Sequence, residues 1–304
     1  MCGLLQCRTI SAKTFCTHLL FVPKYNPVHD EDIERLNNFI NFSKKLLILT
    51  GAGISTESGI PDYRSQGVGL YARSSNRPVQ YQDFVKKEHI RKRYWARNYV
   101  GWPRFSSFRP NSTHTMVRDL EVTYGRVSCV VTQNVDRLHN KAGSQNVIEL
   151  HGTAFNVMCL GCDNKIDRQH LQSLLEERNP HIKATSTMIR PDGDVDISQD
   201  DVRGFQVPSC SQCGGILKPD IVFFGDNVPQ QRVEAVKREV EHCDALLVLG
   251  SSLTVFSSYR IILQASELKR KIAIVNIGPT RGDKHAHIKI DTKCGDIVSR
   301  LRLH

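Results

Sequence analysis

Four cysteines in two Cys-x-x-Cys pairs are the clearest metal-binding pattern in this sequence. The pairs are Cys159 with Cys162 and Cys210 with Cys213. Two such knuckles supply four thiolates, the ligand set of a tetrahedral zinc ion, and leave no coordination position for a substrate. We therefore predict one structural zinc. A redox pair is disfavoured by the glycines in or beside the knuckles. A nucleic-acid-binding ribbon is disfavoured by the absence of interleaved aromatic residues.

A glycine-rich turn, Gly51-Ala52-Gly53, directly follows the apolar run 46–49. Glycines at a strand-to-helix turn let the backbone approach a pyrophosphate held by the helix N-terminus. A tight turn also uses glycine for purely steric reasons. The third glycine, Gly59, comes too late for the usual dinucleotide fingerprint, and no acidic residue ends a second strand about 20 residues on. The turn indicates a nucleotide site and argues against a hydride-transferring oxidoreductase.

Polar residues close two later apolar runs. The cluster 133–136 (Gln-Asn-Val-Asp) follows the run 127–131, and His151 stands just after the run 147–150. An open α/β sheet places ligand contacts at the carboxyl ends of its strands. An imidazole there can act as a base near neutral pH. The alternatives are a helix cap for the Asn and Asp, and a packed or surface position for the histidine.

The elements that must position these residues alternate between short apolar runs and helical stretches. Residues 30–40 have helical spacing behind an acidic first turn, and 230–241 form a second helical stretch. Apolar strands buried on both faces and alternating with helices predict a parallel, Rossmann-like α/β sheet. The runs that we predict as its strands are 46–49, 127–131, 147–150, 221–224, 245–249 and 272–275.

Two stretches interrupt this rhythm. Residues 63–110 are polar, aromatic and basic without clear strands, and residues 155–218 contain the cysteine pairs. The gap between the pairs exceeds the roughly 15–20 residues of a compact zinc ribbon, which indicates an insert there. We predict a catalytic domain over 30–304, with a helical insertion over 63–110 and a zinc-binding insertion over 155–218. The Rossmann-like core would comprise residues 30–62, 111–154 and 219–304.

Composition restricts the partners. The 304 residues have a formal net charge of +10, but the excess is spread along the chain. The densest basic run, 86–93, lies in no nucleic-acid-binding motif, so we interpret it as a solvated helix face and expect no nucleic-acid partner. No run approaches the ~18 apolar residues of a membrane span, so no membrane partner is expected. Ten cysteines without disulfide-framework spacing suit a reducing compartment.

The first 29 residues differ from the rest. They contain Arg8, Lys13, Lys24 and several hydroxyl residues, but no acidic residue before Asp30. An acid-free, basic, hydroxyl-rich leader is typical of a mitochondrial transit peptide, and its removal would take three positive charges with it. A frayed N-terminus without function is the alternative. We predict that residues 1–29 are a transit peptide and that the chain is located in the mitochondrial matrix.

Taken in order, these motifs resemble those of the sirtuins. The segment Tyr94-Trp95-Ala96-Arg97 further resembles the Tyr-x-x-Arg of class II sirtuins. The leader and the long insert between the cysteine pairs are most similar to mitochondrial members of the family. The matching segments lie between Leu46 and Cys294 and are 51–55, 59–64, 132–136, 151–152, the cysteine pairs, 218–225, 250–252 and Asn276.

The resemblance implies an NAD-dependent protein-lysine deacylase. In the family reaction an acyl-lysine oxygen attacks the ribose carbon that carries nicotinamide. A histidine, here His151, then activates a ribose hydroxyl that takes over the acyl group. The implied partners are acyl-lysine proteins, above all mitochondrial metabolic enzymes. The resemblance does not decide whether the acyl group removed is acetyl, acidic acyl, lipoyl or biotinyl. The alternatives are a mono-ADP-ribosyltransferase and a non-enzymatic, NAD-sensing binding protein.

The resemblance also implies residue roles. Tyr94 and Arg97 would contact the acyl group, because an arginine and a tyrosine hydroxyl can clamp a carboxylate; ordinary helix packing is the alternative. The chain departs from common sirtuin residues at Tyr63, Thr153 and Ser257, where Phe, Ser and Pro are frequent. The substrate peptide would add as a strand at Val222, Phe223, Phe224, Gly225 and Leu253. The NAD-binding residues would be Gly51, Ala52, Gly53, Ser55, Asp62, Tyr63, Arg64, Tyr71, Gln133, Asn134, Val135, Asp136, Gly250, Ser251, Ser252, Asn276, Ile277, Gly278 and Cys294.

Overall fold

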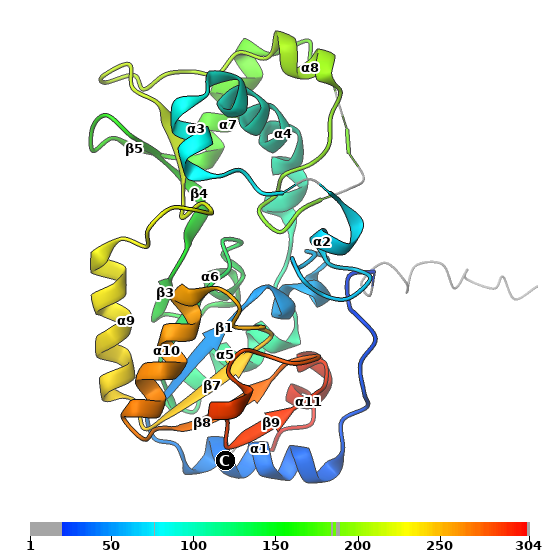
Figure 1. Ribbon diagram of the computed structural model, residues 1–304, viewed down its shortest axis with the longest axis vertical. Helices are drawn as coiled ribbons and strands as arrows, with labels where there is room; N and C mark the ends of the chain where they lie inside the picture. The colour runs from blue at the N-terminus through cyan, green and yellow to red at the C-terminus, as the bar shows by residue number, and fades with distance from the viewer. Residues whose placement is uncertain (1–19, 76, 184, 187–188, 303–304) are drawn as a thin grey trace, which may run out of the picture.

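Two β-sheets form the framework of the protein, shown in Figure 1 as a computed structural model that describes residues 20–75, 77–183, 185–186 and 189–302. Within these residues the larger sheet has six parallel strands, in the order β3 (Val147–Glu149), β2 (Val127–Thr132), β1 (Leu46–Thr50), β7 (Ala245–Leu249), β8 (Lys271–Val275) and β9 (Ile288–Ile290). The smaller sheet has three antiparallel strands, in the order β5 (Lys165–Asp167), β4 (Gly152–Cys159) and β6 (Leu217–Ile221). The predicted α/β class with a Rossmann-like parallel sheet is confirmed.

Helices cover the larger sheet and build a small lobe above it (Figure 1). The large lobe consists of the six-stranded sheet with α1 (Asp30–Phe42), α5 (Ser112–Val122), α6 (Leu138–Ala142), α9 (Gln230–His242), α10 (Phe256–Glu267) and α11 (Cys294–Val298). The small lobe consists of the three-stranded sheet with α3 (Tyr81–Lys86), α4 (Glu88–Ser107), α7 (Arg168–Arg178) and α8 (Gln199–Gly204). The remaining short helices are α2 (Leu70–Arg73) and the 3₁₀ helices η2 (Ala52–Ser58) and η3 (Asp283–His285).

The large sheet is stable because its strands are apolar on both faces. In β1, Leu46 and Ile48 pack with residues of α1, α5 and α11, whereas Leu47 and Leu49 pack with α9 and α10. All five residues of β1 are buried. Full burial of each such side chain contributes about 1.5–3 kcal/mol.

None of the described helices is both long and apolar enough to span a bilayer.

The strand order places a ligand crevice at β1. From β1 the chain builds outward through β2 and β3 on one side, and through β7, β8 and β9 on the other. Open α/β sheets bind ligands outside the carboxyl ends of the strands where this reversal occurs. Thr50 and Leu249, the last residues of β1 and β7, are paired. The loops that follow them therefore begin side by side.

The predicted strand at 221–224 is wrong. Only Ile221 belongs to a strand, and that strand is β6, which pairs antiparallel with β4 rather than with the parallel sheet. Val222 donates its backbone N–H to the carbonyl oxygen of His151, and Phe223 packs in the core of the small lobe. A short apolar run lacks the periodicity that would separate a parallel strand from another buried segment.

Candidate active site and metal centre

A cleft of about 1740 Å³ lies at the carboxyl ends of β1, β2 and β7 and is lined by residues of both lobes. It collects most of the predicted NAD-binding, peptide-binding and catalytic residues, together with Tyr94. Among the predicted NAD-binding, acyl-binding and peptide-binding residues, five do not line it: Gly51, Tyr71, Arg97, Leu253 and Cys294. The predicted residues that line it are Ala52, Gly53, Ser55, Asp62, Tyr63, Arg64, Tyr94, Gln133, Asn134, Val135, Asp136, His151, Val222, Phe223, Phe224, Gly225, Gly250, Ser251, Ser252, Asn276, Ile277 and Gly278.

The glycine turn is held against the loop that follows β7. A Cβ on Gly51 or Gly53 would lie 2.7 or 2.8 Å from the carbonyl oxygen of Gly250, which is closer than real Cβ atoms approach. Gly53 donates its backbone N–H to that same oxygen. Steric need therefore accounts for these two glycines. The helix predicted after the turn is the seven-residue 3₁₀ helix η2.

A chain of hydrogen bonds joins the glycine turn to the end of β2. Asn134 donates its side-chain amide to the carbonyl oxygen of Gly51 and to Oγ of Ser55, each at 3.1 Å. Ser55 donates its hydroxyl to Asp136, with 2.7 Å between Oγ and Oδ2. Burial raises the pKa of Asp136, while the N–H of Leu138 and the Ser55 hydroxyl favour its ionised form. This network holds three cleft-lining polar side chains in one arrangement.

His151 lies between β3 and β4, beside the turn that contains Gln133. Its Nδ1 is 3.1 Å from the carbonyl oxygen of Gln133, and its Nε2 is 2.8 Å from Oγ of Ser257. Burial lowers the pKa of the imidazole to about 4, although the bond to Gln133 opposes this shift. At neutral pH the ring is therefore neutral, which is the state that a general base requires.

The other end of the cleft is built from the loops after β7 and β8. Gln133 donates its side-chain amide to Oγ of Ser251 at 2.8 Å, which joins the β2 and β7 loops. Asn276 lines the cleft, but its amide binds the carbonyl oxygen of Ile277. Cys294 is buried beneath this region, and burial raises the pKa of its thiol to about 12. Cys294 therefore packs beneath the loops after β7 and β8 and does not reach the cleft.

Tyr71 and Leu253 do not line the cleft but contact or adjoin residues that do. The ring of Tyr71 packs against that of Tyr63, with 5.9 Å between the ring centroids, and receives the guanidinium of Arg64 over its face. Leu253 is buried in the core cluster under α9 and α10 and has a φ of 55°. Both residues would act on a ligand only through their cleft-lining neighbours.

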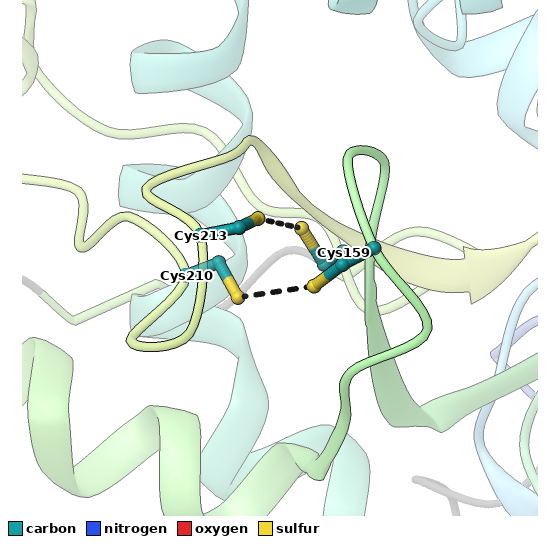
Figure 2. Close-up of side chains that lie close together, drawn as sticks. Cys159, Cys210 and Cys213 are labelled. Carbon is teal, nitrogen blue, oxygen red and sulfur yellow. Dashed lines mark hydrogen bonds between the residues drawn. The ribbon is translucent and has the colours of Figure 1, made fainter.

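The four knuckle cysteines converge on one point. Their sulfur atoms all lie within 4.8 Å of one another, and Figure 2 shows the labelled Cys159, Cys210 and Cys213 directed together. The Sγ–Sγ distances are 3.4 Å for Cys159–Cys213 and 3.8 Å for Cys162–Cys210. Zn–S bonds of ~2.3 Å in a tetrahedron separate the sulfurs by roughly 3.8 Å. These donors fit one zinc ion.

The backbone around the cysteines is also suited to a metal site. A Cβ on Gly215 would lie 2.9 Å from Sγ of Cys159, so only glycine allows the knuckles to close. The N–H of Gly161 and the side-chain amide of Asn164 point at cysteine sulfurs. Such donors orient and stabilise thiolates around a metal. The close contacts between opposite knuckles favour this interpretation over a redox pair within one Cys-x-x-Cys.

Tyr94 and Arg97 have different surroundings, although both lie on α4. Tyr94 lines the cleft among aromatic rings, and its buried hydroxyl has no hydrogen-bond partner in the described part of the chain. Arg97 instead forms ion pairs with Asp194 at 2.9 Å and Asp196 at 2.6 Å. These carboxylates belong to the insert between the cysteine pairs. The insert also reaches the cleft wall, through Asp192 and its neighbour Pro191.

Residues 22–26 form a part of the cleft wall that sequence reasoning missed. The carbonyl oxygen of Asn26 accepts from the Thr292 hydroxyl at 2.8 Å, and Lys293 lies over the ring of Tyr25. This segment belongs to the predicted leader, whose first 19 residues lie outside the part that the structure describes. A transit-peptide composition contains no signal for a cleft-lining role.

Comparison with known proteins settles the family. A sequence model of the Sir2 family matches residues 51–257. This chain belongs to the Sir2 family. It is 55% identical to "NAD-dependent protein deacylase Sirt4" of Drosophila melanogaster, over 98% of this chain and 95% of that protein. It is 53% identical to "NAD-dependent protein lipoamidase sirtuin-4, mitochondrial" of Homo sapiens, over 92% of this chain and 88% of that protein.

Solved Sir2 structures share this fold. The one described as "Sir2-p53 peptide-NAD+" has a TM-score of 0.70 and 30% identity, and the match covers 88% of this chain and 96% of that one. "Sir2 bound to acetylated peptide" has the same TM-score and coverage at 29% identity. The predicted membership of the sirtuin family is confirmed, and the predicted resemblance to mitochondrial sirtuin four agrees with the high identity to proteins of that name.

Proposed function

We propose that this Sir2-family chain is an NAD-dependent protein-lysine deacylase that releases nicotinamide and transfers the acyl group to ADP-ribose. The observation that carries the proposal is His151, whose neutral imidazole faces the cleft beside the Gln133–Asp136 turn. The deacylase and lipoamidase names of the Sirt4 relatives support the same activity.

The residues of the cleft would divide the reaction between them. The Ser55–Asn134–Asp136 network would hold the nicotinamide end of NAD, whose glycosidic bond is the one that breaks. The substrate's acyl-lysine would lie between 224–226 and 254–255, two segments that line the same cleft. Exclusion of water and fixed orientation favour attack by a weak nucleophile such as a carbonyl oxygen. His151 would then accept a proton at Nε2.

Product analysis tests this proposal. Purified protein is incubated with NAD and a panel of acyl-lysine peptides, and the products are measured by mass spectrometry. We expect free lysine peptide, nicotinamide and acyl-ADP-ribose in equal amounts. ADP-ribose attached to protein, without acyl-ADP-ribose, would instead indicate a mono-ADP-ribosyltransferase. NAD binding without either product would indicate an NAD-sensing binding protein.

We propose that Tyr94 contacts the acyl group directly and that Arg97 acts on it through the insert. The cleft position and unpartnered hydroxyl of Tyr94 support the first role. The ion pairs of Arg97 with Asp194 and Asp196 support the second, because they hold the segment that brings Asp192 to the cleft wall. A direct carboxylate clamp by Arg97 would require these pairs to open first.

Substitution of Arg97 by Met separates the two roles. A direct clamp predicts that kcat/KM falls by roughly tenfold or more for glutaryl-lysine and little for acetyl-lysine, because a charge-assisted bond is lost. Anchoring of the insert predicts equal losses for both substrates and a lower Tm. We expect the second pattern. Arg203→Met, at an exposed residue of α8, is the matched control and should leave kcat/KM unchanged for both substrates.

Location and domain organisation extend the proposal. Relatives named mitochondrial support a mitochondrial location, and we propose the matrix with metabolic enzymes as substrates. Because residues 22–26 line the cleft, we place the cleavage of the leader before residue 22 rather than at 29. The separate cores of the two lobes support the proposed insertions over 63–110 and 155–218.

A further inference from the structure

Ser257, in the first turn of α10, forms a hydrogen bond with His151. Oγ of Ser257 lies 2.8 Å from Nε2 of the imidazole, and Nδ1 lies 3.1 Å from the carbonyl oxygen of Gln133. A carbonyl oxygen only accepts, so Nδ1 must bear the ring's hydrogen in the neutral form. Nε2 is then the acceptor, and the Ser257 hydroxyl donates to it.

This geometry occupies the only basic position of the imidazole. A neutral ring has one in-plane lone pair, on the nitrogen that lacks hydrogen. Here that lone pair is directed at Oγ of Ser257, and both side chains line the cleft. A proton from a ligand in the cleft therefore reaches His151 through the Ser257 hydroxyl, unless the serine moves away.

We propose that Ser257 is a proton-relay residue between His151 and the ligand hydroxyl that His151 activates, an inference that rests on the proposed deacylase function. Oγ takes the proton of the ligand hydroxyl while it passes its own proton to Nε2. Two O–H bonds break, one on the ligand and the original one on Ser257, while a new O–H bond forms on Ser257 and an N–H bond forms on His151. The electron pair left on the ligand oxygen bonds to the acyl carbon, and the π pair of that carbon moves onto the heteroatom to which it was doubly bonded. Ser257 ends neutral and the imidazole ends cationic.

The ring needs no reorientation for this transfer. Nδ1–H continues to donate to the carbonyl oxygen of Gln133 throughout, and that bond is stronger once the ring is charged. Ser257 has its heavy atoms in place beforehand and changes only which hydrogen it holds. The chain separates Ser257 from His151 by 106 residues, so the start of α10 and the turn between β3 and β4 must be correctly packed to form the pair.

The test compares three variants of the full chain with the wild type. Ser257→Ala removes the hydroxyl, and Ser257→Thr keeps it. Ser266→Ala is the matched control, because Oγ of Ser266 contacts Nδ1 of His285 at 3.1 Å near the other end of α10. We expect Ser257→Ala to lower kcat for acyl transfer by about tenfold, with KM for NAD and nicotinamide release changed by less than about twofold. Ser257→Thr should restore most of kcat.

A spectroscopic measurement on the ligand-free protein tests the contact itself. In ¹⁵N NMR the Nε2 signal of His151 should move in Ser257→Ala, because its hydrogen-bond donor is lost, and should stay in place in Ser266→Ala. An unchanged Nε2 signal would overturn the contact on which the relay depends.

The kinetic outcomes are separable. Unchanged or faster acyl transfer in Ser257→Ala would overturn the relay, and so would an equal loss of nicotinamide release, which would indicate a structural role. An acyl or ADP-ribosyl adduct on Ser257 would show a nucleophile instead. If the wild type makes no acyl-ADP-ribose from any peptide, the proposed function itself fails.

Discussion

Replacing His151 with Phe is expected to lower acyl transfer by about 10²–10⁴-fold, the usual contribution of a positioned general base. Phe fills a similar volume but has no nitrogen that could accept a proton. The backbone bond from Val222 to the carbonyl oxygen of residue 151 does not depend on the side chain. NAD affinity and folding should therefore be largely retained. Product formation, NAD titration and Tm measure these three properties.

His170→Phe is the matched control for this substitution. His170 is an exposed residue of α7 in the small lobe, so the same chemical change there should leave acyl transfer within about twofold of the wild type. If His151→Phe turned over as fast as the control, the imidazole would not be the base. If it lost NAD affinity together with turnover, the ring would instead be needed to shape the cleft.

The parallel sheet was predictable because burial on both faces leaves a simple pattern. The run 245–249 is apolar at every position, and it forms β7 in the middle of the sheet with all five residues buried. The run 221–224 is equally apolar, but its pairing partner is β4 and its last residues turn into the cleft. An apolar run indicates that a segment is buried, but it does not indicate which strand the segment pairs with.

Site residues were predictable where their position follows directly from the end of a strand in the parallel sheet. His151 and Gln133 each follow a strand of the same sheet, so their proximity follows from the topology. Contacts between remote segments follow no local rule. The pairing of Arg97 with the insert crosses about a hundred residues, and no spacing in the sequence indicates it. Ser257 was visible only as an unusual residue for a sirtuin, with no sign of its histidine partner.

Loss of one zinc ligand is expected to destabilise the small lobe and, through it, the active site. Cys210→Ser should remove zinc and lower the stability by several kcal/mol, because a structural zinc site contributes about 10–16 kcal/mol in isolated finger peptides. The knuckles close the β4–β6 pair at Cys159 and Leu217. At its other end this pair holds Gly152 beside Ile221, directly next to His151 and the cleft-lining residue Val222.

Acyl transfer should therefore fall together with zinc content, even though no knuckle cysteine lines the cleft. Elemental analysis, calorimetry and product formation measure the three effects. Cys243→Ala is the control: this buried cysteine lies outside the cluster, so its substitution should cost about 1 kcal/mol and leave one zinc per chain. A Cys210→Ser protein that kept both its zinc and its Tm would contradict a four-cysteine structural site. A Cys210→Ser protein that lost turnover but kept its Tm would indicate a catalytic metal. That result would contradict the structural role, because four thiolates leave no coordination position for a substrate.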